Sequence, residues 1–301
     1  MGKTAFIFPG QGAQYTGMGK DFYERFPVSR EIFDKASRVT GIDIPALCFE
    51  ENPDLHITRY TQIAMLAAEA AMLRAVEEQG LHADVHAGLS LGEYTALLAS
   101  GVMSEEHIFL AVLKRGLFMQ EAVPTGGAMA AVLGADTAFV ERICGETEGI
   151  VSIANYNCPG QVVITGEEAA VEKAGEALRK SGARRIVPLK VSGPFHSRML
   201  EDAGQQLGKV LEVLKTSEFT VPYVSNVTAD YVREPSEVKE LLIRQVSSPV
   251  RWQQCVERMI ADGVDTFVEI GPGKTLTGFM RKIDRNVKTI NIEKVEDLAR
   301  I

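Results

Sequence analysis

The sequence Gly88-Leu89-Ser90-Leu91-Gly92 places a serine between two glycines, where an expected strand over 85–88 gives way to an expected helix over 91–100. A glycine on each side of the serine permits a turn that is too sharp for larger side chains. The helix after the turn directs its first backbone amides toward an oxyanion formed at the serine. The motif therefore favours an α/β fold with a nucleophilic Ser90, and the alternative is a glycine-rich turn with a surface serine.

Strands and helices alternate along most of the chain. We expect a strand over 4–8, a helix over 61–79 that stops before Gly80, and a helix over 104–122 with Ser104 as its N-cap. After residue 191, further segments of this pattern are expected at 197–215, 223–225, 237–245 and 266–270, with a final strand at 287–292. Such alternation predicts a parallel sheet that is covered by helices on both faces.

The order of elements changes between residues 124 and 191. Strands are expected at 129–133, 151–156, 162–165 and 185–189, and helices at 137–146 and 167–180. Their order is βαββαβ, the split unit of a ferredoxin-like fold. We therefore expect a small ferredoxin-like subdomain over 124–191, inserted into a large α/β subdomain built from 1–123 and 192–301.

Composition excludes several classes of protein. The 301 residues carry a formal net charge of −8, which disfavours nucleic-acid or anionic-membrane binding because both need a cationic surface. The four cysteines are far apart and form no C-x-x-C pair, so no structural metal is expected. The apolar run at the N-terminus is too short for a signal peptide, and no stretch has the length of a membrane helix. A cytoplasmic protein is expected.

A serine nucleophile needs a base, and His196 is the best placed of the five histidines. It lies in Ser192-Gly193-Pro194-Phe195-His196-Ser197, a Gly-Pro loop that precedes an expected helix. Such a loop can present a side chain to a pocket on a rigid scaffold. A purely structural role for this histidine is the alternative.

Arg115 lies on the apolar face of the expected helix over 104–122. It follows Ile108 and Val112 and precedes Met119 at spacings of four, three and four residues, which place all four side chains on one side. A guanidinium in that position needs an anionic partner, because an unpaired buried charge is unfavourable. The partner is either an internal carboxylate or a carboxylate on the substrate, which arginine can bind through two hydrogen bonds.

Two glycine-rich loops suggest other roles. Gln11, after the first strand, can direct its backbone N–H toward the oxyanion of a serine enzyme. The segment Gly271-Pro272-Gly273-Lys274-Thr275 looks like a phosphate loop, but residue 268 is Val where that motif requires Gly. We interpret this segment as a strand-to-helix turn, and no nucleotide site is expected.

Several motifs together resemble one enzyme family. They are Gly10-Gln11-Gly12-Ala13-Gln14, Gly88 to Glu93, Lys114-Arg115-Gly116, Asn157-Cys158-Pro159-Gly160-Gln161, Phe195-His196-Ser197 and Glu269-Ile270-Gly271-Pro272-Gly273. In this order, and over nearly the whole chain, they resemble the malonyl-CoA:acyl-carrier-protein transacylases of type II fatty acid synthesis. The resemblance implies an α/β-hydrolase-like subdomain with a parallel sheet, a ferredoxin-like subdomain, and an active site in the cleft between them.

The resemblance also implies roles for residues that match the family's motifs. Ser90 corresponds to the nucleophile, His196 to its general base and acid, and Arg115 to the residue that binds the malonyl carboxylate. Gln11 and Leu91 correspond to the residues whose backbone amides form the oxyanion hole. The implied reaction moves a malonyl group from malonyl-CoA to the phosphopantetheine thiol of acyl carrier protein, with neither a cofactor nor a metal.

Further positions match less central parts of the family's site. A main-chain carbonyl near Gln245 would orient the histidine in place of an aspartate, while Gln62 and Asn157 would support the pocket. Phe195 is similar to the pattern that accompanies malonyl selection in related acyltransferase domains. The chain departs from the family at Leu89, where histidine is common. Because that residue stands beside the serine and is not its base, the departure leaves the Ser-His pair intact.

Three alternatives remain open at this point. The same chemistry can serve polyketide synthesis, and the residues that carry it would be the same. A serine thioesterase or hydrolase can use the same turn, but it would need an acidic residue between Ser90 and His196 to complete a triad. A non-catalytic binding module would not need the serine, the histidine and the arginine together.

Overall fold

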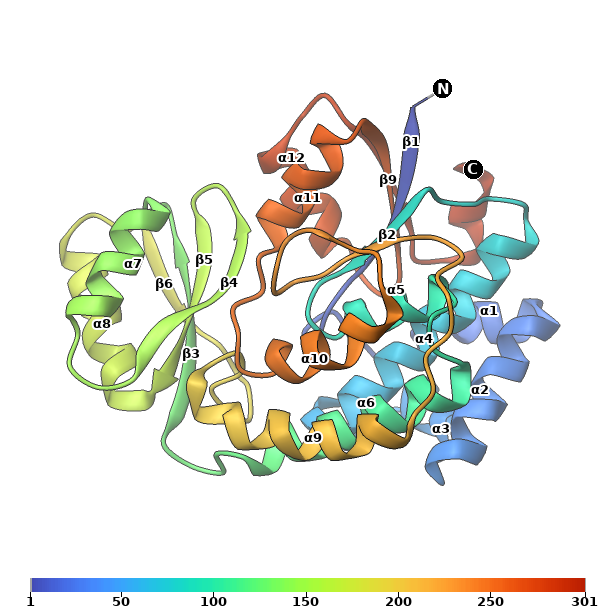
Figure 1. Cartoon of the computed structure of the whole chain (residues 1–301), viewed down its shortest axis with the longest axis horizontal. Helices are drawn as coiled ribbons and strands as arrows, with labels where there is room; N and C mark the ends of the chain where they lie inside the picture. The colour runs from blue at the N-terminus through green and yellow to red at the C-terminus, as the bar shows by residue number, and fades with distance from the viewer. Residues whose placement is uncertain (1, 301) are drawn as a thin grey trace.

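The computed structural model describes residues 2–300, and its helices are arranged around two separate β-sheets (Figure 1). The larger sheet has the strand order β10-β9-β1-β2-β7-β8, and the smaller sheet has the order β4-β5-β3-β6. The larger sheet contains β1 (Lys3–Phe8), β2 (Val85–Gly88), β7 (Tyr223–Val224), β8 (Tyr231–Val232), β9 (Val264–Ile270) and β10 (Lys288–Ile292). The smaller contains β3 (Gly127–Leu133), β4 (Val151–Cys158), β5 (Gln161–Glu167) and β6 (Arg185–Pro188).

Most of the helices pack on the larger sheet or on one another beside it. They are α1 (Lys20–Arg25), α2 (Pro27–Thr40), α3 (Ile44–Phe49), α4 (Thr58–Glu78), α5 (Gly92–Ala99), α6 (Glu105–Glu121), α9 (Glu201–Val213), α10 (Pro235–Gln245), α11 (Trp252–Ala261) and α12 (Thr275–Ile283). The helices α7 (Thr137–Glu146) and α8 (Glu168–Lys180) belong to the smaller sheet, and short 3₁₀ helices occur at Pro53–His56, Arg198–Leu200 and Val295–Arg300. None of the helices within residues 2–300 combines the length and apolar character that crossing a bilayer requires.

The larger sheet is buried on both faces, as its strand pattern predicts. Strand β1 pairs in parallel with both β2 and β9, and its residues alternate between two cores. Ala5 and Ile7 pack with α11 and α12, whereas Phe6 and Phe8 pack with α4 and α5. A continuous apolar run is the expected sequence of such a central parallel strand. The prediction of a helix-covered parallel sheet is therefore confirmed.

Strand β8 is the exception to the parallel arrangement. It consists of Tyr231 and Val232, and it pairs antiparallel with β7 at the edge of the sheet. The sheet is therefore mixed rather than wholly parallel. Because β8 has only two residues, it shows no apolar periodicity from which it could be predicted.

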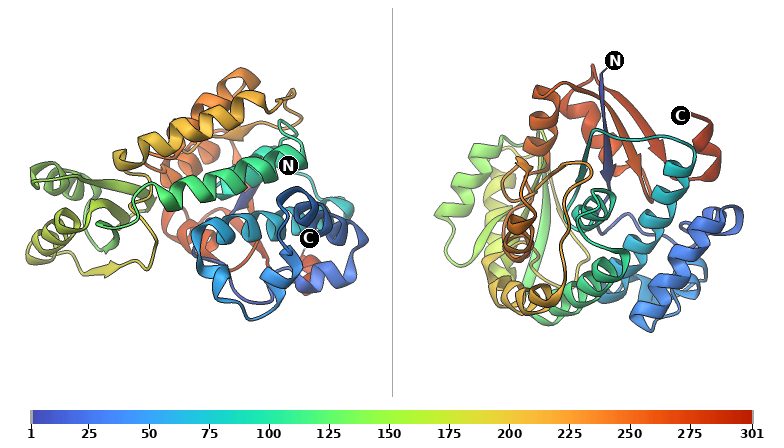
Figure 2. Two further views of the ribbon diagram at one scale, coloured as in Figure 1. Left: turned by 90° about the horizontal axis from the view of Figure 1, so that it is seen from below. Right: turned by 45° about the vertical axis from the view of Figure 1, so that its right-hand side comes forward.

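The smaller sheet has the predicted βαββαβ order and is antiparallel throughout. Figure 2 shows it, with α7 and α8, projecting to one side of the helices around the larger sheet. Alternate side chains of its strands face opposite ways: Ala130 and Val132 pack on the helices, while Met129 and Ala131 line a cavity. One face of this small sheet therefore forms a wall of the cavity.

Candidate active site

Ser90 lies between β2 and α5 in a strained backbone conformation. Its φ is 54°, in the left-handed region that non-glycine residues seldom occupy. The side chain of Asn226 holds the turn from both sides, since its Oδ1 accepts from the Ser90 N–H at 2.7 Å and its Nδ2 donates to the Gly88 carbonyl at 2.7 Å. Strain of this kind persists where the surrounding structure fixes it, and it is common at functional sites.

The two glycines of the motif are required by close packing. A Cβ atom on Gly88 would lie 1.9 Å from the carbonyl carbon of Gly92, and a Cβ atom on Gly92 would lie 2.2 Å from the carbonyl oxygen of Phe8. No side chain fits at either position. The turn predicted from the sequence is therefore present, and it brings α5 directly against the ends of β1 and β2.

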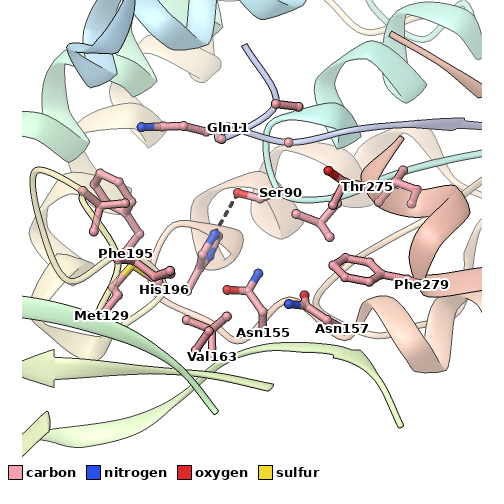
Figure 3. A pocket seen from close by; sticks show the side chains of 18 of the residues that line it. Gln11, Ser90, Met129, Asn155, Asn157, Val163, Phe195, His196, Thr275 and Phe279 are labelled. Carbon is pink, nitrogen blue, oxygen red and sulfur yellow. Dashed lines mark hydrogen bonds between the residues drawn. The ribbon is translucent and has the colours of Figure 1, made fainter. Parts of the chain in front are cut away.

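His196 faces Ser90 although 106 positions separate the two in the sequence. Its Nε2 lies 2.8 Å from the Ser90 Oγ, and the two side chains point toward each other across the floor of the cavity (Figure 3). Its Nδ1 lies 2.9 Å from the carbonyl oxygen of Gln245 and 3.1 Å from that of Ser248. Carbonyl oxygens can only accept, so Nδ1 carries the proton and Nε2 is free to accept one from Ser90.

The environment of His196 keeps the imidazole neutral. Burial, together with the positive charge of Arg115, lowers its pKa to about 4, whereas the bonds to the Gln245 and Ser248 carbonyls act in the opposite direction. Only the neutral imidazole can accept a proton. The histidine is thus in the form that a general base requires throughout the neutral pH range.

Arg115 reaches the same point from α6, and its side chain is fully buried. It donates to the Oε1 of Gln62 at 2.8 Å, to the Oε1 of Gln245 at 3.0 Å and to the Oγ of Ser90 at 3.1 Å. Its guanidinium also lies over the ring of Tyr94, 5.2 Å from the centroid. All these partners are neutral, so within residues 2–300 the guanidinium is not committed to an internal ion pair.

The two residues predicted to supply oxyanion amides flank the serine. Gln11 follows β1, Leu91 follows Ser90, and neither backbone N–H donates to any acceptor within residues 2–300. The side chain of Gln11 is engaged elsewhere, because its Nε2 donates to Thr58 Oγ1 at 3.0 Å, so only the backbone N–H of Gln11 is a candidate oxyanion donor. Two unpaired amides beside a nucleophile are the donor arrangement that an oxyanion hole needs.

The cavity above Ser90 has a volume of about 270 Å³ and lies between the two sheets. Phe195, Met129 and Phe279 give it apolar walls, and Asn155 and Asn157 face into it from β4, opposite Ser90 (Figure 3). Asn157 therefore lines the cavity, but its side chain makes no hydrogen bond to the Ser90 and His196 pair. No group of three potential metal-ligating side chains gathers anywhere within residues 2–300.

The structure adds two residues that the sequence did not reveal as part of the site. Asn226 holds the turn at Ser90, and the buried carboxylate of Glu93 accepts from the Gln245 side chain at 2.6 Å and from the Asn226 backbone N–H at 3.2 Å. Asn226 follows β7 and Ser90 follows β2, so both lie at the carboxyl ends of neighbouring parallel strands. A polar residue at the carboxyl end of a strand was the signal that could have indicated it.

Known proteins resemble the chain over almost its whole length. A family model described as acyl transferase domain matches residues 5–296. The malonyl CoA-acyl carrier protein transacylase of Bacillus subtilis is 44% identical over 303 residues, which cover 99% of this chain and 96% of the relative. The chain belongs to the malonyl CoA-acyl carrier protein transacylase family.

Solved structures of malonyl CoA-acyl carrier protein transacylases have the same fold. The enzyme of Clostridium perfringens matches with a TM-score of 0.96 at 43% identity, covering 99% of this chain and 95% of that one. A malonyl-transacylase solved in complex with a type II polyketide acyl-carrier protein matches with the same TM-score at 40% identity, covering 99% and 98%. The predicted α/β fold, with its hydrolase-like larger part and its ferredoxin-like smaller part, is confirmed.

Proposed function

We propose that this protein transfers a malonyl group from malonyl-CoA to the phosphopantetheine thiol of acyl carrier protein, through a malonyl ester on Ser90. The observation that carries the proposal is the meeting of three groups at the floor of one cavity. The Ser90 hydroxyl lies 2.8 Å from the imidazole of His196 and 3.1 Å from the guanidinium of Arg115. A base and a carboxylate-binding cation beside one hydroxyl suit an acid-bearing acyl donor.

In the first half of the reaction, His196 Nε2 takes the hydroxyl proton as Ser90 Oγ forms a bond to the thioester carbon. The carbonyl electrons move to oxygen, and the backbone amides of Gln11 and Leu91 bind this oxyanion. The oxyanion then re-forms the carbonyl as the C–S bond breaks, and the imidazolium gives its proton to the departing coenzyme A thiolate. The carrier-protein thiol reverses these steps in the second half.

Arg115 serves the other end of the acyl group. When malonyl-CoA binds, its free carboxylate replaces the contact between the guanidinium and the Ser90 hydroxyl, which also releases that hydroxyl for attack. Gln62 and Gln245 accept from the remaining N–H groups and hold the guanidinium plane in place. A planar guanidinium held in this way binds a carboxylate through two parallel hydrogen bonds. Phe195 and the other apolar walls leave the acyl chain little room.

A serine hydrolase is the second candidate, because it would share the serine, the histidine and the oxyanion hole. It would be expected to orient the imidazole with a carboxylate. Here the partners of His196 Nδ1 are two main-chain carbonyls, those of Gln245 and Ser248, which favours the transferase. Polyketide synthesis would employ the same residues as fatty acid synthesis, and we propose the latter because the motifs of the sequence resemble the transacylases of that pathway.

The position of the cavity between the two sheets supports a division of the chain into two subdomains. We propose a large catalytic subdomain over 1–123 and 192–301 and a small subdomain over 124–191, with the cavity between them. A cytoplasmic location suits an enzyme that meets both coenzyme A and carrier protein.

Transfer and hydrolysis are separated by one assay. Malonyl-CoA is supplied to the enzyme with carrier protein that bears phosphopantetheine, with carrier protein that lacks it, or alone. We expect malonyl-carrier protein only in the first case, and little free malonate in any. Malonate release at the same rate in all three would identify a hydrolase and contradict the proposal.

The pKa of His196 predicts how transfer depends on pH. The base works only when it is neutral, that is, above its own pKa of about 4, whereas an ordinary histidine would lose this form below about pH 6.5. We therefore expect no loss of kcat/KM between pH 7 and pH 5 and a fall with a midpoint near 4, in enzyme that circular dichroism shows to be folded. A fall with its midpoint near pH 6.5 would contradict this environment for the imidazole.

A further inference from the structure

Glu93 is a buried carboxylate that the reaction above does not use. It lies in the first turn of α5, has no exposed surface, and is absent from the walls of the cavity. One of its oxygens, Oε2, accepts from the Gln245 side chain at 2.6 Å and from the Asn226 backbone N–H at 3.2 Å, while Oε1 has no partner within residues 2–300. Desolvating a carboxylate is unfavourable, so a buried carboxylate needs a compensating positive charge or hydrogen bonds nearby.

The amide of Gln245 stands between Glu93 and Arg115. Its Nε2 donates to the carboxylate, and its Oε1 accepts from the guanidinium at 3.0 Å. The amide dipole thus has its positive end on the anion and its negative end on the cation. This orientation also directs Nε2 to the Ser90 carbonyl at 2.9 Å, so one side chain joins both charges to the nucleophile's backbone.

The side chains of Arg115 and Glu93 are linked by the hydrogen bonds of Gln245 and form no direct ion pair. Burial lowers the pKa of Arg115, and the nearby Tyr94 and Glu93 act in the opposite direction. A carboxylate in direct contact would have occupied the N–H groups that a substrate needs. Glu93 is joined to the guanidinium through Gln245 and does not line the cavity, whereas Arg115 does.

We propose that Glu93 is a positioning residue that determines specificity. Its negative charge stabilises Arg115 in the empty enzyme and weakens the attraction of Arg115 for the substrate's carboxylate. This inference rests on the proposed transfer of malonyl groups. A negative charge close behind the binding site opposes a second carboxylate, so it lowers the advantage of malonyl over a neutral acyl group. The residue acts through Gln245 and Arg115 and does not touch substrate.

Glu93→Gln tests the charge with little change of shape. The new amide can keep a carbonyl oxygen at the position of Oε2 and so retain both accepted hydrogen bonds. At pH 8 we expect the ratio of kcat/KM for malonyl-CoA to that for acetyl-CoA to rise roughly tenfold, the size expected for removing one nearby charge from a buried site. An unchanged or lower ratio would overturn the proposal.

Glu69→Gln is the matched control. Glu69 is also fully buried, and its carboxyl accepts from Thr95 on the same helix α5, but within residues 2–300 it makes no hydrogen bond with Gln245 or Arg115. Burial raises its pKa well above the ordinary value, and Arg115 is not among the groups that shift it, so the substitution leaves the charge that acts on Arg115 unchanged. We expect the control to keep the wild-type ratio, even where its melting temperature changes.

A measurement on the wild type keeps the test decisive if Glu93→Gln does not fold. Burial raises the pKa of Glu93 to about 7, against the hydrogen bonds from Gln245 and Asn226 and the charge of Arg115. The acidic form prevails below that pH, so the malonyl-to-acetyl ratio should rise as pH falls from 8 to 6. Both donors use the same Ser90 and His196, so the titration of the imidazole cancels in the ratio.

The other titratable groups around Glu93 do not change charge in that interval. They are Arg115 of α6, Tyr94 of α5, Tyr223 of β7 and Cys255 of α11, whose charges interact with that of Glu93. Burial raises the pKa of the two phenols and of the thiol, so they stay neutral, and the arginine stays charged.

A malonyl-to-acetyl ratio that is flat from pH 8 to 6 would contradict the proposal. Failure of the proposed function would be distinct, since no malonyl transfer would then be measurable.

Discussion

Ser90→Ala is expected to reduce malonyl transfer by at least about 10⁴-fold, because the covalent route disappears with the hydroxyl. What remains is the binding of both substrates and the oxyanion amides, which alone give a small residual rate in serine enzymes. The measurement is the rate at which malonyl-carrier protein forms from malonyl-CoA under single-turnover conditions. Alanine can occupy the same strained backbone position, and the amide that bonds Asn226 is retained.

Binding should survive this substitution. The affinity for malonyl-CoA is expected to stay within a few-fold of the wild type, since the cavity walls and Arg115 are untouched. A Ser90→Ala enzyme that transfers malonyl at a tenth of the normal rate or faster would show that another group carries the acyl chain.

Arg115→Ala is expected to reduce kcat/KM for malonyl-CoA by about 10²- to 10³-fold, the usual effect of removing one partner of a buried, hydrogen-bonded charge pair. Acetyl transfer should change by less than about tenfold, because a neutral acyl group has no carboxylate for the guanidinium to bind. The measurement is the pair of kcat/KM values with malonyl-CoA and acetyl-CoA at one pH.

Arg74→Ala provides the control for this variant. Arg74 is a partly buried arginine, and its guanidinium pairs with Glu77 and Glu105, away from the cavity. Its loss should leave both kcat/KM values unchanged. Equal losses with both donors in Arg115→Ala would mean that the arginine maintains the cavity rather than selecting the acyl group.

The sequence predicts the parts of this structure that local patterns determine. The turn at Ser90 follows from two glycines between a strand and a helix, and the ferredoxin-like part follows from short alternating runs. Helix α4 begins at Thr58, three residues before its predicted start at Thr61, which is ordinary for helix ends. The segment after Ile270 is a strand-to-helix turn, as interpreted, with α12 beginning at Thr275.

Other parts depend on contacts between distant segments. The short helices α1 and α3 have six residues each, too few for a helical period to be recognised. The positions of Asn226 and Glu93 depend on tertiary structure, because each acts on residues that lie more than a hundred positions away. Nothing in the neighbouring sequence separates Glu93 from an ordinary acidic residue in the first turn of a helix.

The identity of the second orienting carbonyl also needed the structure. The resemblance placed a main-chain carbonyl near Gln245, and the imidazole in fact lies within hydrogen-bonding distance of the carbonyls of both Gln245 and Ser248. A backbone oxygen leaves no mark on the sequence, because every residue has one.

The covalent malonyl-Ser90 intermediate is tested most directly by intact-mass measurement of the wild-type enzyme after brief exposure to malonyl-CoA. We predict a mass increase of one malonyl group, located on the peptide that contains Ser90 and removed when phosphopantetheine-bearing carrier protein is added. An unmodified enzyme that still transfers malonyl, or the same adduct on Ser90→Ala, would contradict the account.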